Sequence, residues 1–64
     1  VGDVEVSTVF LGIDYSFGQG PPLVFETLVF GGALNREEQR YSTWEEAEAG
    51  HRAMMSRVKE ASDA

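Results

Sequence analysis

His51 is the single histidine of this 64-residue chain, and imidazole is the side chain best suited to acid–base chemistry near neutral pH. A nucleophilic site also needs a serine or cysteine beside the histidine and an acid that orients it. The chain has no cysteine, and none of its serines lies in a nucleophile-elbow motif. His51 falls within a regular apolar pattern, where a histidine is usually a packed side chain. The sequence therefore predicts no catalytic residue, and a small hydrolase or metal-binding protein centred on His51 and Asp14 is the weaker alternative.

Asp14, Glu26 and His51 together offer two carboxylates and one imidazole, which are acceptable metal ligands. Their spacing does not support a site, because the three residues belong to different predicted elements. Glu26 interrupts an apolar strand, and it either pairs with Arg40 or faces solvent at an edge. The glycines lead into no phosphate-binding loop and no dinucleotide-binding unit. We expect no metal and no cofactor.

The charge balance limits the partners of the chain. Eleven acidic and five basic residues give a net charge of −6 at pH 7. Because Lys and Arg supply most of the non-specific affinity for nucleic acids, we expect no DNA or RNA partner. The acidity either keeps a small protein in solution or complements a basic partner surface. No run approaches the roughly 20 apolar residues of a membrane-spanning helix, so no membrane partner is expected.

The length predicts a single small domain over residues 1–64. A chain this short has a thin core, and it lacks cysteines for a disulfide or a zinc site. Tight packing, a partner or self-association must therefore supply the stability.

Two segments carry the β-branched and aromatic residues that favour a pleated sheet, Val4 to Asp14 and Leu23 to Phe30. Between them, residues 16–22 contain two glycines and two prolines, which favour a turn. So short a connection predicts an antiparallel β-hairpin. Residues Gln39 to Ser42 predict a short third strand. With the helix described next, the predicted fold is α+β.

A C-terminal helix is expected from Trp44 to Glu60, followed by a frayed tail over residues 61–64. Its apolar stripe has spacings of three and four residues, which place the stripe on one face. Gly50 interrupts the helix and marks either a close approach of a strand or a neutral surface position. The stripe consists of Trp44, Ala47, His51, Met54, Val58 and Ala61. Two capping boxes are possible, Ser42 with Glu45 and Thr43 with Glu46.

Both faces of the predicted hairpin are largely apolar, but one helix covers only one face. We expect the other face to meet a partner, most simply a second copy of the chain, or else to be covered by the loop at 31–39. The expected helix–sheet core pairs Val9, Leu11, Ile13, Phe25 and Val29 with Trp44, Ala47, His51, Met54 and Val58. The candidate interface consists of Val4, Val6, Phe10, Val24, Leu28 and Phe30.

Three motifs, FLGID at 10–14, PPLVFETLVFGG at 21–32 and YSTWEEAEAGH at 41–51, carry a resemblance that covers residues 6–58. The chain resembles small uncharacterised proteins of bacteriophages and prophages, often of actinobacteria. Such relatives often read Asp-His where this chain has Asp14-Tyr15, and this departure argues against a catalytic role at that position.

The resemblance implies a viral context, with the host cytoplasm or the virion as the location. The expected function is a non-enzymatic protein-interaction module that binds itself or a host protein. The alternative is a structural or assembly subunit of a phage particle.

Overall fold

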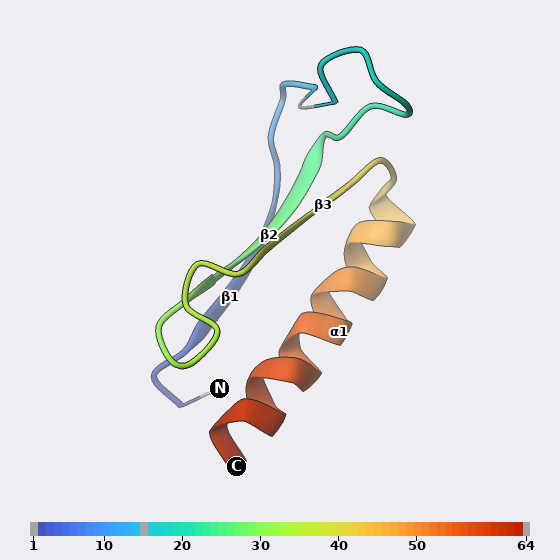
Figure 1. The fold of residues 1–64 in the computed structure, drawn as a ribbon. Coiled ribbons are helices and arrows are strands. Elements are labelled where there is room, and N and C mark those ends of the chain that lie inside the picture. The colour runs from blue at the N-terminus through green and yellow to red at the C-terminus, as the bar shows by residue number, and fades with distance from the viewer. Residues whose placement is uncertain (1, 15, 64) are drawn as a thin grey trace.

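A three-stranded antiparallel sheet is covered on one face by one C-terminal helix (Figure 1). The computed structural model describes residues 2–14 and 16–63. The predicted α+β fold and its hairpin are confirmed, and the third strand is present. The strands lie side by side in the order β1 (Glu5–Phe10), β2 (Phe25–Phe30) and β3 (Glu38–Tyr41), and the helix is α1 (Trp44–Asp63).

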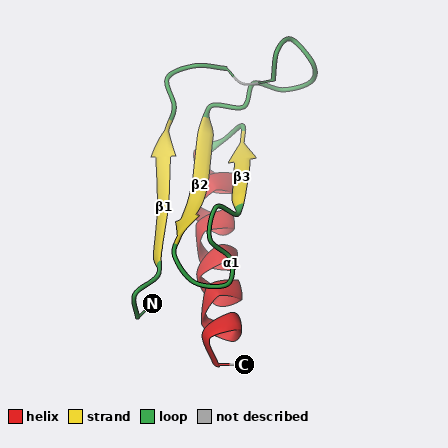
Figure 2. Cartoon of the chain, turned by 60° about the vertical axis from the view of Figure 1, so that its left-hand side comes forward, coloured by secondary structure: helices red, strands yellow, loops and turns green. Residues whose placement is uncertain are grey.

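The strands of the hairpin are shorter than predicted, because β1 ends at Phe10 and β2 begins at Phe25. Gly12 has a positive φ of 74°, which breaks the extended backbone after Leu11. The connection at 11–24 therefore forms a long loop beyond the end of the sheet (Figure 2). The Leu11 N–H still donates to the Val24 carbonyl at 2.7 Å, so one hydrogen bond continues the pairing beyond the ends of β1 and β2.

The register determines which side chains face the helix. Val6 pairs with Val29 and Thr8 with Thr27, and residues directly opposite each other in an antiparallel pair share a face. Val29 is fully buried against the helix. The covered face of the sheet therefore carries the even-numbered residues of β1 and the odd-numbered residues of β2. The buried cluster consists of Val29, Met54 and Val58, with Val4, Val6 and Leu34 packed against it.

The predicted face of β1 is wrong. Val9 lies opposite Glu26 on the uncovered face and is 47% exposed, while Ile13 lies in the long loop and is 61% exposed. Leu11 follows the end of β1. Both faces of β1 are apolar, so alternation alone does not show which face the helix covers.

On the helix, the predicted stripe is confirmed at its buried positions. Ala47, Met54 and Val58 are all buried. Trp44 is 56% exposed, and it contacts the sheet through Phe25, with ring centroids 5.8 Å apart.

One of the two possible capping boxes forms. The Glu46 N–H donates to Thr43 Oγ1, and the Thr43 N–H donates to Glu46 Oε1, both at 3.1 Å. Glu46 Oε1 also accepts the Ser42 N–H at 3.0 Å, so the pairing predicted for Ser42 and Glu45 is wrong. The helix continues to Asp63, beyond its predicted end at Glu60.

Candidate functional site

The uncovered face of the sheet is the first candidate site, and we call it the open face. Its apolar side chains are Val9 on β1 and Leu28 and Phe30 on β2. Charged and polar side chains surround them, so the face is amphipathic instead of uniformly apolar. The open face consists of Glu5, Ser7, Val9, Glu26, Leu28, Phe30, Glu38 and Arg40.

An ion pair crosses the middle of the open face. Arg40 Nε donates to Glu26 Oε2 at 3.0 Å, and the Glu26 side chain is only 15% exposed. Arg40 also approaches Glu38 at 3.8 Å. The predicted partner of Glu26 is therefore confirmed, and the pairing accounts for a carboxylate within an apolar strand. Counting Glu5, the face carries three carboxylates and one guanidinium, so it is acidic.

A hollow of about 300 Å³ lies beside the end of β2 on this face. Phe30 is 48% exposed there, which is a large exposure for an aromatic side chain on a central strand. Two apolar and three polar side chains line the hollow. The lining residues are Leu28, Phe30, Asn35, Arg36 and Glu38.

The loop between β2 and β3 does not cover the open face, contrary to the alternative predicted for it. Leu34 turns to the other side and packs against the buried cluster under the helix. Asn35 Oδ1 accepts the Gly31 N–H at 2.7 Å, which closes the loop on itself. Among the described residues, this loop leaves the Phe30 ring half exposed.

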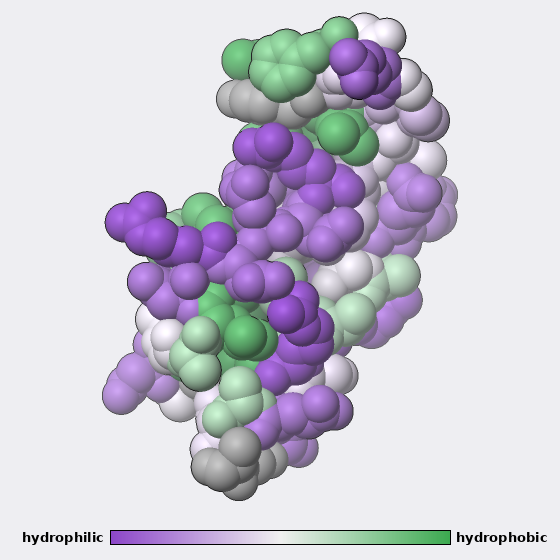
Figure 3. Space-filling view, in the orientation of Figure 1, coloured by the Kyte–Doolittle hydropathy of each residue, from purple (hydrophilic) through white to green (hydrophobic). Residues whose placement is uncertain are grey.

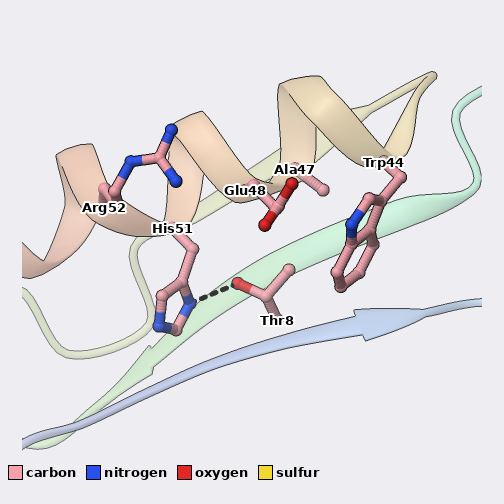
Figure 4. A pocket seen from close by; sticks show the side chains of 6 residues that line it. All are labelled: Thr8, Trp44, Ala47, Glu48, His51 and Arg52. Carbon is pink, nitrogen blue, oxygen red and sulfur yellow. Dashed lines mark hydrogen bonds between the residues drawn. The ribbon is translucent and has the colours of Figure 1, made fainter.

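The second candidate site is a cleft of about 300 Å³ between β1 and the helix (Figure 4). Thr8 forms its floor on the sheet side, and the other lining side chains come from one flank of α1. These are Trp44, Ala47, Glu48, His51 and Arg52.

Four polar side chains meet below this cleft. The Tyr41 hydroxyl donates to Thr27 Oγ1 at 3.2 Å, Thr27 and Thr8 share a hydrogen bond of 2.5 Å, and Thr8 Oγ1 lies 2.6 Å from His51 Nδ1. If each hydroxyl donates once, the chain of hydrogen bonds runs from Tyr41 to the imidazole. Thr27 is fully buried, and the network satisfies its hydroxyl. The network therefore joins all three strands to the helix.

The sequence did not reveal this network. The feature of the sequence that points to the network is that Thr8 and Thr27 both interrupt apolar strands. Once the register is known, these two positions face the same side of the sheet. His51 was predicted as a packed residue of the helix stripe, and it does face the sheet, although its contact is polar.

The three residues weighed as metal ligands are not brought together. Glu26 lies on the open face, whereas His51 lies under the helix on the other side of the sheet. Asp14 lies in the long loop, where its Oδ1 accepts the N–H groups of Ser16 at 2.8 Å and Leu23 at 2.9 Å. Within residues 2–14 and 16–63, no three His, Cys, Asp or Glu side chains cluster as metal ligands.

The two backbone donors also affect the charge of Asp14. The Ser16 N–H, followed by the Leu23 N–H, lowers the pKa of this carboxyl below its ordinary value of 3.8, because both hydrogen bonds favour the ionised form. Asp14 is therefore a carboxylate that fixes the shape of the long loop.

Exposed aromatic side chains gather where the helix begins. Phe10 and Phe25 lie edge to face with centroids 5.5 Å apart, and Trp44 packs on Phe25. Phe10 remains 66% exposed. The long loop adds the exposed Ile13 and Phe17, and Figure 3 shows apolar side chains at that end and over the lower part of the molecule, separated by a hydrophilic band.

The predicted interface set divides between these surfaces. Leu28 and Phe30 lie on the open face. Val4 and Val6 pack under the helix, so their assignment to the uncovered face is wrong. Phe10 lies on the helix side, next to Phe25. Val24 precedes β2, is half-buried, and donates its N–H to the Tyr41 carbonyl at 3.0 Å.

Comparison with known proteins adds no relative: no protein-family model, curated protein or solved structure matches this chain. Among residues 2–14 and 16–63, α1 does not have the length and hydropathy needed to cross a membrane.

Proposed function

We propose that this chain is a small, non-enzymatic protein-interaction module that binds a partner protein through the open face. The observation that carries the proposal is the exposure of Phe30, at 48%, beside a hollow on the central strand that the partly buried Leu28 also lines. Exposed apolar side chains rimmed by polar groups are typical of protein-binding surfaces.

The chemistry of the open face indicates what its partner presents. The hollow beside Phe30 suits one apolar side chain. Glu38 and Arg36 line the hollow with opposite charges, Glu5 lies opposite Phe30 on β1, and the chain as a whole carries a net charge of −6. We therefore expect an apolar anchor surrounded by Lys or Arg on the partner, because such charges accelerate and orient the encounter.

The polar network supports a non-enzymatic role for His51. Its Nδ1 bonds to Thr8, whose hydroxyl also bonds to the buried Thr27. In a nucleophilic triad an acid orients the histidine, and no carboxylate among the described residues hydrogen-bonds to His51. The arrangement is that of a histidine used to join the helix to the sheet.

The resemblance to phage proteins supports a host protein as the partner, with the host cytoplasm or the virion as the place of action. Affinity capture from host lysate tests this with three baits: the unmodified chain, Phe30→Ser and Phe17→Ser. Phe17 is 82% exposed on the long loop, so it provides a matched loss of an exposed phenyl ring away from the open face.

We expect the unmodified chain and Phe17→Ser to retain one stoichiometric protein, and Phe30→Ser to lose it. If a folded Phe30→Ser bait retains that protein equally well, the open face is not the binding surface. Recovery of the chain as a component of purified virions, with no host protein captured, would favour the assembly-subunit alternative.

A further inference from the structure

The outer edge of β1 is unpaired within the described chain, because β1 is an edge strand (Figure 2). Val29 donates its N–H to Glu37 and accepts the Arg36 N–H, so its backbone groups face β3. The Val6–Val29 pair is therefore a non-hydrogen-bonded pair of the β1–β2 ladder. By the alternation of such a ladder, the N–H and C=O groups of Val6, Thr8 and Phe10 point outward from β1.

The two edges of the sheet differ in protection. Isolated edge strands are usually protected by a proline, by Lys or Arg, or by shortness. The edge strand β3 has only four residues, and it carries Glu38 and Arg40. The six residues of β1, EVSTVF, include no proline and no basic residue, and five of the six are uncharged. The edge of β1 is therefore the one suited to pairing with another strand.

Apolar surface lies beside this edge on the helix side. Phe10 is 66% exposed and Trp44 is 56% exposed, and both contact Phe25. The cleft between β1 and the helix opens next to them. A strand added at the edge of β1 would extend the sheet under this cleft and bury the Phe10 ring.

We propose that β1 pairs antiparallel with β1 of a second copy of this chain, around a two-fold axis at Thr8. Centring the pair on Thr8 uses every outward backbone group of Val6, Thr8 and Phe10. The same register sets Phe10 of one copy opposite Val6 of the other, on the side that the helices cover. The dimer has a continuous six-stranded sheet, and this interface is separate from the open face and independent of the proposed function.

The charges beside the cleft favour a second copy as the occupant. The hydrogen bond from Thr8 places the axis next to His51, and the oppositely charged Glu48 and Arg52 lie on either side of that residue along the helix. A two-fold axis there sets Glu48 of each copy towards Arg52 of the other. Each helix packs across all three strands, with β2 in the middle. Three strand spacings separate β2 of one copy from β2 of the other, so the two helices lie roughly 14 Å apart, a gap that these long side chains span.

Sedimentation equilibrium tests the proposal with three forms: the unmodified chain, Phe10→Lys and Phe17→Lys. Each variant exchanges one exposed phenylalanine for lysine, but only Phe10 lies at the edge of β1. We expect the unmodified chain and Phe17→Lys to sediment at twice the chain mass of 7.0 kDa. We expect Phe10→Lys to sediment as a monomer, and its far-UV circular dichroism to show that it is folded. A monomeric unmodified chain, or a dimeric Phe10→Lys, would overturn the proposal.

A charge exchange tests the geometry separately. Glu48→Arg alone sets like charges against each other across the axis, so we expect dimerisation about tenfold weaker. The double variant with Glu48→Arg and Arg52→Glu restores the pairing, and we expect it to recover the affinity of the unmodified chain. Equal dimer affinity of the unmodified chain, Glu48→Arg and the double variant would contradict the two-fold arrangement. So would a double variant that dimerises no more tightly than Glu48→Arg.

Discussion

The phenol ring of Tyr41, the last residue of β3, occupies the space that a side chain at Gly50 of the helix would need. A Cβ built at Gly50 overlaps the ring and hydroxyl of Tyr41. Of the two explanations for a glycine inside this helix, close approach of a strand is therefore confirmed. The contact also positions the Tyr41 hydroxyl to reach Thr27.

Gly50→Ala is expected to destabilise the fold by about 1–3 kcal/mol, because the added methyl group displaces the ring of Tyr41. The same change at an unobstructed helix position stabilises a protein by about 1 kcal/mol. Urea unfolding gives the free energies. The control is Gly50→Ala in a Tyr41→Ala background, where the alanine is expected to be stabilising. A stabilising Gly50→Ala in the unmodified chain would show that the two elements are not in contact.

Thr27→Val is expected to cost about 1–3 kcal/mol, because it removes the hydroxyl that both Tyr41 and Thr8 use while keeping the side chain's shape. A double-mutant cycle with Thr8→Val, measured by urea unfolding, isolates the shared hydrogen bond. We expect the double variant to lose less than the sum of the two single losses. Strict additivity would mean that the two hydroxyls act independently.

The helix cap provides a prediction with a built-in comparison. Thr43→Ala is expected to lower the free energy of unfolding by about 1 kcal/mol, since Thr43 Oγ1 accepts the Glu46 N–H. Ser42→Ala is the matched control, because only its backbone N–H takes part in the cap. Thermal unfolding followed by circular dichroism compares the two. An equal or larger loss in Ser42→Ala would reverse the assignment.

Asp14 gives the long loop a defined pH response. Its pKa is lowered in the folded chain, so its hydrogen bonds are fully present above 3.8 and are lost as the pH falls through the lower, folded value. The amide proton shifts of Ser16 and Leu23 are expected to titrate with a midpoint below 3.8. The Gly31 amide, which bonds to neutral Asn35, is the control. A midpoint at or above 3.8 would show that the carboxylate does not hold the loop.

The helix was predictable because its signals are local. The Thr43–Glu46 cap lies within a few residues of sequence, and the burial of Met54 and Val58 follows from helical spacing alone. The faces of the hairpin were not predictable, because Val6 and Val9 are equally apolar, and only pairing with β2 decides which of them meets the helix.

The polar network was missed for the same reason. Its members, Thr8, Thr27, Tyr41 and His51, are distant in sequence, and they meet only once the register of all three strands is set. The hollow on the open face likewise depends on where the loop at 31–37 turns. Local patterns therefore predicted the elements, whereas the candidate sites arise from their pairing.

The most direct test of the open face is photocrosslinking in the host cell, with p-benzoylphenylalanine incorporated in place of Phe30 or, in a parallel strain, in place of Phe17. Both rings are exposed, but only Phe30 lies on the open face. We predict one dominant adduct between the chain and a host protein from position 30, and none from position 17. The same adduct from position 17 at equal or greater yield, or no adduct from position 30, would contradict binding through the open face.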